Sequence, residues 1–215
     1  MEVKLPVGIK KSEIIIDAER IPATQTVAYL KAHALNTGKD LDRILPICHT
    51  KDGDFHLHEK AFEFNHSLND TWQAYKNIPP GSAWSGSNLM FSFAYDSKPG
   101  KISYSEDHYD GMKENQLVFI VIKLLFGFFK LAVTHFVHTI SEDEKKVKLC
   151  YVEGGKSSGS QYLYFEELAD KKTKVIHHTY YKSESNFRDK WLYPPLHGMI
   201  ISQFHNNVKK YLATK

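Results

Sequence analysis

The feature that most constrains the fold is a series of strand-like segments that leads into one long amphipathic helix. The segments are rich in β-branched and aromatic residues and span Leu89–Tyr95, Lys101–Glu106, Leu117–Leu125, Lys130–Ile140, Lys146–Glu153, Gln161–Glu167 and Lys174–Ser183. Short separators such as Asp110-Gly111 contain residues that favour turns. The series therefore predicts an antiparallel meander of about six strands.

The last segment of the chain has the pattern of a helix with one apolar face. Its apolar stripe consists of Leu196, Ile200, Phe204, Val208, Tyr211 and Leu212, and the other face carries Asn206, Asn207, Lys209 and Lys210. A strongly twisted sheet curls, and a helix laid across its concave face closes a cavity. We therefore expect an α+β protein with a curved antiparallel sheet wrapped around the long C-terminal helix.

A strand and a short helix precede the meander. Alternation from Phe55 to Phe64 predicts the strand, and Ser67 followed by Asp70 resembles a capping box that starts a helix. The helix should end at Pro79.

The first fifty residues have a different pattern. A strand is expected at Glu13–Ile16, and Val27, Leu30 and Leu35 then recur at near-helical spacing. Residues 1–54 are therefore expected to form an N-terminal helical extension that packs on the main body, residues 55–215.

The order of elements resembles that of the START-like superfamily, also called SRPBCC. The matching stretches are Ala61–Trp72, Gly154–Phe165 and Lys174–Thr179, and the resemblance covers about Phe55–Leu212. The superfamily includes polyketide cyclase-like proteins and birch-pollen-allergen-like carriers, and it is known for a helix-grip fold. The resemblance implies that residues 55–215 form a START-like ligand-binding domain, which binds a hydrophobic small molecule or lipid in its cavity.

Aromatic residues are unusually frequent, with 13 Phe, 12 Tyr and 3 Trp making 13% of the chain. Tyrosine suits a pocket for a largely apolar ligand with a few polar atoms, but it is also an ordinary strand residue. Both interpretations stay open. The candidates for the cavity wall are Trp72, Trp84, Phe119, Tyr151, Tyr162, Tyr164, His178, Tyr180, Trp191, Met199, Ile200 and Phe204.

No sequence motif establishes catalysis. His197 opens the last helix and is the best acid/base candidate, with His205 farther along and Tyr180 as a second candidate. A solvent-exposed helix histidine is the alternative. The stretch Gly154–Ser160 lacks the spacing of a phosphate loop and precedes a strand, so it predicts a hairpin.

The histidines do not predict a metal site. His56 and His58 share one strand face, but the nearest further ligands, Glu59 and Glu63, lie on the other face. His177 and the adjacent His178 should point to opposite faces. We expect neither a metal nor another cofactor.

Charge and cysteine content limit the location and the partners. A net charge of +3 does not predict a nucleic-acid binder. Cys48 and Cys150 are far apart, without metal-type spacing, and indicate neither a disulfide scaffold nor a zinc site. A reducing compartment and a cytoplasmic location are therefore expected, since Met1–Lys11 also lacks the pattern of a signal peptide. Charged residues interrupt the apolar stretch Leu117–Val133, which favours two strands around a turn over a membrane-spanning helix.

The segment Ser183–Tyr193 should lie at the cavity mouth. Its basic and aromatic residues could bind an acidic ligand group or make transient contact with a membrane, and the alternative is a loop anchored by Trp191. Trp84 is a second candidate for the entrance.

Three functions follow from this pattern. The first is binding, transport or sensing of a hydrophobic small molecule or lipid. The alternatives are a cyclase-, hydrolase- or isomerase-like enzyme on the same fold and an interaction module with a filled core. The oligomeric state and the identity of the ligand stay open.

Overall fold

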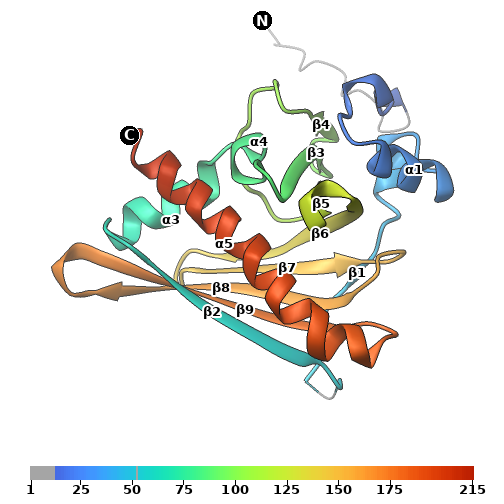
Figure 1. Ribbon diagram of the computed structural model, residues 1–215. Helices are drawn as coiled ribbons and strands as arrows, with labels where there is room; N and C mark the ends of the chain where they lie inside the picture. The colour runs from blue at the N-terminus through green and yellow to red at the C-terminus, as the bar shows by residue number, and fades with distance from the viewer. Residues whose placement is uncertain (1–12, 52) are drawn as a thin grey trace, which may run out of the picture.

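The computed structural model describes residues 13–51 and 53–215, which form a nine-stranded antiparallel sheet with a long helix across one face (Figure 1). The strands are β1 (Pro46–Ile47), β2 (His56–Phe64), β3 (Leu89–Asp96), β4 (Lys101–Ser103), β5 (Gln116–Leu124), β6 (Phe129–Ser141), β7 (Lys146–Val152), β8 (Ser158–Leu168) and β9 (Lys172–Lys182). The helices are η2 (Ala18–Arg20), α1 (Thr24–Ala32), α2 (Gly38–Leu41), α3 (Leu68–Asn77), α4 (Pro80–Ala83), η3 (Leu125–Gly127), η4 (Ala169–Lys171), the π-helical turn η5 (Arg188–Leu192) and α5 (Tyr193–Leu212). The predicted curved antiparallel sheet with a C-terminal helix is confirmed.

The strand order is β2-β9-β8-β7-β6-β5-β3-β4, and β1 pairs with the end of β7. Neighbours from β5 to β9 are consecutive in the chain, as expected for a meander joined by short turns. The first long strand, β2, pairs with the last one, β9, along its full length, with His56 opposite Tyr181 and Phe64 opposite Thr173. The strand that precedes the meander therefore extends it at the β9 edge.

Helices α3, α4 and α5 pack against the inner face of the sheet. Ser67 caps α3 as predicted, since its Oγ accepts a hydrogen bond from the backbone N–H of Asp70 over 3.1 Å. Trp72 and Tyr75 on α3 and Val208 on α5 are buried in the main core, together with the inward side chains of the strands. The apolar stripe of α5 is therefore the surface that meets the sheet.

The N-terminal segments cover the opposite face of β3 and β5. Apolar residues such as Leu30 and Leu41 pack there against Phe93 and Phe119 in a second core. A buried hydrogen bond of 2.8 Å joins the hydroxyls of Thr26 and Ser92. The strand expected at Glu13–Ile16 is wrong, because only an isolated bridge between Ile15 and Thr37 forms.

The two cysteines form a disulfide, which corrects the prediction made from their spacing. Pairing of β1 with β7 brings the Cα atoms of Cys48 and Cys150 to 4.9 Å, and their Sγ atoms are bonded. This contact spans 102 residues of sequence, so no local pattern could show it. Disulfides persist mainly in oxidising compartments, and the pair therefore does not support the predicted reducing compartment.

The most apolar stretch of the chain forms the hairpin of β5 and β6, with η3 at its tip. The prediction of two strands around a turn is confirmed. Among residues 13–51 and 53–215, no helix combines the length and the apolar content needed to cross a membrane.

Candidate functional site

A cavity of about 260 Å³ lies between the inner face of the sheet and the helical segment η5–α5. Its apolar wall consists of Trp84, Ile120, Ile122, Leu124, Leu131, Val133, Leu192, Leu196, Ile200 and Ile201. Its polar wall residues are His135, Tyr151, Ser157, Gln161, Arg188, Tyr193 and His197. The predicted cavity between sheet and helix is therefore present, with a mostly apolar wall.

Gln161 on β8 connects the polar part of this wall. Its amide nitrogen lies 3.1 Å from Nε2 of His135 and 3.1 Å from the hydroxyl of Tyr151, while its amide oxygen lies 3.0 Å from Nε2 of His177. The hydroxyl of Tyr151 is hydrogen-bonded to that of Tyr193 at the start of α5. One glutamine thus holds side chains from β6, β7 and β9.

The hydrogen-bonded network continues away from the cavity. Nδ1 of His177 lies 2.9 Å from Nε2 of His205 on α5, and Nδ1 of His205 is hydrogen-bonded to the hydroxyl of Tyr75 on α3. Both histidines are buried. The network therefore crosses the interior from α3 to the cavity.

The partners fix where the protons lie. The amide nitrogen of Gln161 only donates, so Nε2 of His135 accepts; the amide oxygen only accepts, so Nε2 of His177 donates. A neutral His177 then accepts at Nδ1 from His205, which in turn accepts from Tyr75. Every hydrogen bond of this network thus pairs one donor with one acceptor while all of its imidazoles are neutral.

Burial keeps these histidines neutral, because an imidazolium loses its hydration inside the protein. Desolvation lowers the pKa of His135 to about 4. It also holds the pKa values of His177, His197 and His205 well below the ordinary range, with a smaller contribution from neighbouring basic groups. At neutral pH the wall therefore carries no charged histidine.

His197, the predicted acid/base residue, lies on the cavity wall. Its Nδ1 is 3.1 Å from Nδ1 of His58 on β2, and its ring stacks on Tyr193 with the centroids 4.9 Å apart. His58 is half-buried, whereas His197 is buried. The pair connects the cavity to the β2 edge of the sheet.

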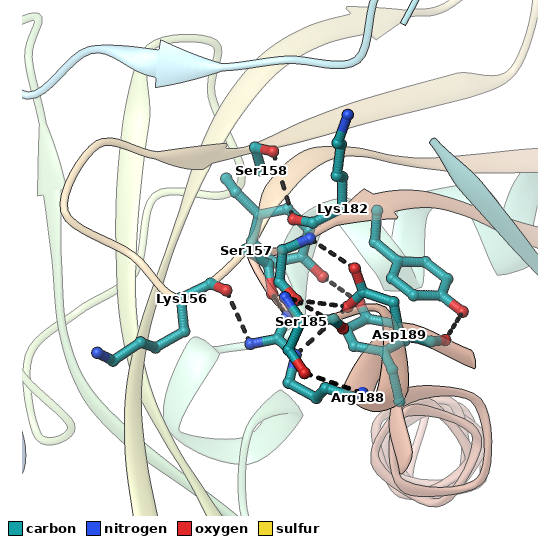
Figure 2. A network of polar contacts seen from close by, with 11 residues as sticks. Lys156, Ser157, Ser158, Lys182, Ser185, Arg188 and Asp189 are labelled. Carbon is teal, nitrogen blue, oxygen red and sulfur yellow. Dashed lines mark hydrogen bonds and ion pairs between the residues drawn. The ribbon is translucent and has the colours of Figure 1, made fainter. Parts of the chain in front are cut away.

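A polar cluster holds the segment η5 against the turn between β7 and β8 (Figure 2). The guanidinium of Arg188 donates to the backbone oxygen of Lys156 over 2.8 Å and to Oγ of Ser157 over 2.6 Å. Nε of Arg188 also lies 3.4 Å from Oδ1 of Asp189. The carboxylate of Asp189 is buried and accepts hydrogen bonds from N and Oγ of Ser183, both over 2.7 Å. Arg188, although it lines the cavity, is therefore already paired.

Three of the predicted cavity residues, Trp84, Tyr151 and Ile200, lie on the wall. Phe204 lies behind it and stacks on Trp84 with the centroids 4.4 Å apart. Trp72 packs elsewhere in the same core, edge-on to Phe165. These positions follow from the helical period of α3 and α5, which turns only part of each buried stripe toward the cavity.

Four predicted cavity residues, Tyr162, Tyr164, His178 and Tyr180, lie on the opposite face of the sheet. Alternation along β8 and β9 turns the odd-numbered residues toward α5 and these even-numbered ones away from it. On that outer face His49 stacks on Tyr180, and Nε2 of His178 lies 2.7 Å from Oε2 of Glu59. The acid/base candidate Tyr180 is therefore not a cavity residue.

Three further candidates, Phe119, Met199 and Trp191, do not line the cavity. Phe119 stacks on Phe93 beneath the N-terminal segments, on the outer face. Met199 and Trp191 are exposed, Trp191 to 70%. The interpretation that Trp191 anchors the loop Ser183–Tyr193 is wrong, because Asp189, which is 1% exposed, is the buried anchor.

Sequence reasoning missed His135 and Gln161. Both occupy inward positions of strands whose other inward residues, such as Val137 and Leu163, are apolar. The sequence did contain a signal for them: each is a polar residue at a position where the alternation of the strand calls for an apolar one. Buried polar groups are usually hydrogen-bonded, so such a residue indicates a buried hydrogen bond.

The two strand histidines, His56 and His58, contact different side chains. His58 bonds to His197, whereas the ring of His56 lies 5.6 Å from that of Tyr181. In the part of the chain that the structure describes, no group of three His, Cys, Asp or Glu side chains is arranged to hold a metal ion.

Solved structures with this architecture include several known proteins. Norcoclaurine synthase from Thalictrum flavum, solved with dopamine and hydroxybenzaldehyde, superposes with a TM-score of 0.53 and 12% identity, covering 79% of this chain and 97% of that one. Major latex-like protein 151 from Panax ginseng superposes with a TM-score of 0.53 and 10% identity, covering 74% of this chain and 98% of that one. Protein Ms6760 from Mycobacterium smegmatis superposes with a TM-score of 0.52 and 15% identity, covering 80% of this chain and 98% of that one.

The chain therefore has the START-like helix-grip fold, the SRPBCC or birch-pollen-allergen-like fold that the sequence resembles. No protein-family model and no curated protein matches the sequence. At these identities the similarity shows the fold, and the chemistry of the site has to be argued from the residues of this chain.

Proposed function

We propose that the protein binds a small, largely apolar molecule in the cavity between the sheet and α5, and that it transports or senses this molecule. The observation that carries the proposal is the 260 Å³ cavity with its mostly apolar wall. In another protein, an engineered apolar cavity of ~150 Å³ holds one benzene molecule. In proportion, the cavity of this protein encloses roughly ten non-hydrogen atoms. A protein of the same fold was solved with dopamine and hydroxybenzaldehyde, which are also small aromatic molecules.

Native mass spectrometry of the purified protein, followed by extraction and identification of any retained molecule, tests this proposal. Binding of naphthalene, an uncharged fluorophore that matches the cavity in size, provides a second measurement. Leu196→Trp should fill the cavity and abolish fluorophore binding, whereas Leu57→Trp on an exposed position of β2 should leave it intact. Absence of both a retained molecule and fluorophore binding would overturn the proposal.

The presence of His197 on the wall favours an acid/base enzyme as the second candidate function. A buried neutral imidazole can accept a proton from a bound ligand, and the adjoining His58 offers a hydrogen-bonded partner nearer to solvent. The test compares wild type with His197→Gln, using the molecule that co-purifies. Chemical conversion that the variant loses would support an enzyme, and binding without conversion would support a carrier.

We also propose that the cavity mouth makes transient contact with an anionic membrane. Exposed apolar side chains flank the mouth on two sides: Leu125, Phe126, Phe128 and Phe129 at the β5–β6 tip, and Phe187, Trp191 and Leu192 in and next to η5. Lys123 and Lys130 border the first group, and Lys190 lies within the second. Aromatic residues next to lysines suit the interface of an anionic bilayer.

The cavity and the disulfide also bear on the predicted interaction module and on the predicted location. A cavity of this size does not fit the alternative of an interaction module with a filled core. We propose residues 1–54 as an extension and residues 55–215 as the ligand-binding domain. The disulfide of Cys48 and Cys150 favours an oxidising compartment over the cytoplasm.

A further inference from the structure

We infer that the cavity selects an uncharged ligand that carries one hydrogen-bond acceptor, such as a ketone or ester carbonyl, on an otherwise apolar body. This inference rests on the proposed binding function and specifies its ligand. Its basis is the number of donors at the polar part of the wall, compared with the acceptors that the protein provides there.

The first donor without an acceptor belongs to His135. Its Nε2 accepts from Gln161, so the proton of the neutral ring is on Nδ1. That Nδ1 is buried and has no hydrogen-bond partner among the described residues, although the side chain is only 4% exposed. Leaving a buried donor unpaired is costly, and a ligand acceptor would remove this cost.

The second donor comes from the pair of phenols. Tyr151 and Tyr193 together have two hydroxyl protons, and their mutual hydrogen bond uses one of them. Gln161 donates to Tyr151 and so takes up neither proton. Within residues 13–51 and 53–215, one phenolic proton therefore remains without an acceptor.

The two donors belong to one polar cluster on the wall. Gln161 contacts both His135 and Tyr151, whose rings lie 5.6 Å apart. The apolar body of a ligand would meet Ile122, Val133 and Ile200. This arrangement suits a molecule with a single polar atom, because most of the remaining wall is apolar.

The charges of the wall disfavour a carboxylate at this position. Burial keeps His135 and His197 neutral, which removes two groups that could have balanced an anion. Arg188 is paired with Asp189 and with the β7–β8 turn. A buried carboxylate would therefore lack a counter-charge, which is far more costly than burial of a carbonyl.

The test uses three naphthalenes of similar size: 2-acetylnaphthalene, 2-isopropylnaphthalene and 2-naphthoate. Isothermal titration calorimetry at neutral pH should give an affinity for the ketone about tenfold higher than for the hydrocarbon, the effect of one well-formed hydrogen bond. The carboxylate should bind more weakly than the ketone. Equal binding of ketone and hydrocarbon, or strongest binding of naphthoate, would overturn the inference while leaving the proposed function standing. Failure of all three to bind would count against the proposed function itself.

Variants locate the preference at the wall. Tyr151→Phe combined with Tyr193→Phe should reduce the ketone's advantage over the hydrocarbon, whereas hydrocarbon binding should stay unchanged. Tyr95→Phe is the matched control, because it removes a buried phenol on the other face of the sheet, where Tyr95 donates to Asp42. A ketone preference that the double variant keeps in full would overturn the assignment of a donor to this pair of phenols. Should that variant fail to fold, the comparison of ketone and hydrocarbon on the wild-type protein still decides the inference.

Discussion

His177 on β9 and His205 on α5 form a buried hydrogen bond of 2.9 Å between their imidazole rings. The bond joins the long helix to the sheet, both side chains are buried, and the ring of His205 stacks on Phe62 with the centroids 3.8 Å apart. Both side chains are held in the neutral form, so the helix and the sheet are joined by a contact that protonation of His177 at Nδ1 would break.

The first prediction is a loss of stability in mild acid. The pKa values of His135, His177, His197 and His205 are lower in the folded state than the ordinary value, so below about pH 6.5 the unfolded chain binds more protons. Stability is therefore complete above that pH and falls as the pH decreases toward the folded pKa values. Between about pH 7.5 and 5.5 we expect a loss of roughly 1 kcal/mol per buried histidine. Urea unfolding at several pH values measures this slope, and a flat profile would contradict the neutral network.

The second prediction concerns His205→Phe. This change leaves the hydroxyl of Tyr75 and Nδ1 of His177 buried without their present partner. We expect the free energy of unfolding to fall by about 2–4 kcal/mol, since each unpaired buried group costs about 1–3 kcal/mol. His108→Phe, at a side chain that is 86% exposed, is the control and should change stability little. Denaturant unfolding of both variants at neutral pH gives the comparison.

The third prediction concerns the disulfide. The bond between Cys48 and Cys150 closes a loop with a sequence separation of 102, and it ties β1 to β7. Because a cross-link of this length restricts the unfolded chain, Cys48→Ser with Cys150→Ser should lower stability by about 2–5 kcal/mol. Dithiothreitol should lower the Tm of the wild type but not that of the double variant. A wild-type Tm that is insensitive to the reductant would mean that the bond contributes little.

The fold was largely predictable because its signals are local. The Ser67 cap, the stripe of Ile200 and Phe204, and the turn-rich separators each depend on residues close together in the sequence. The disulfide of Cys48 and Cys150 depends instead on two segments that meet only in the folded chain. For that reason its spacing carried no usable information.

The cavity wall was less predictable for a physical reason. A period of two shows that Tyr162 and Tyr164 share one face of β8, but it does not show which face meets α5. Polar Gln161 and His177 lie on the inner face, so the usual rule that the more apolar face is buried gave little guidance there. Their hydrogen bonds to each other and to His205 are what allow these side chains to be buried.

The fourth prediction concerns the buried anchor of η5. Asp189→Ala removes the acceptor of both Ser183 groups and the counter-charge of Arg188, which lines the cavity. We expect a loss of about 3–5 kcal/mol in stability, because a partly buried guanidinium loses its charge partner. Glu184→Ala, at an exposed neighbouring position, serves as the control. Thermal unfolding of the two variants should separate them clearly, and equal Tm values would show that Asp189 does not anchor the segment.

The fifth prediction tests contact with a membrane. Phe126 and Phe128 are the most exposed large apolar side chains at the β5–β6 tip, next to the cavity mouth. Phe126→Ser with Phe128→Ser should reduce the affinity for vesicles of phosphatidylserine and phosphatidylcholine, measured by co-sedimentation, by roughly tenfold or more, because about 1.5–3 kcal/mol of favourable burial is lost for each ring that enters the interface. The exposed side chains make no buried core contact, so the Tm should stay unchanged. Leu57→Ser, an equally apolar change on β2, should not affect sedimentation. Binding of the wild type to phosphatidylcholine vesicles alone should be weaker, since the neighbouring lysines then lack anionic lipid. Equal sedimentation of wild type and the phenylalanine double variant would rule out this tip as the membrane contact.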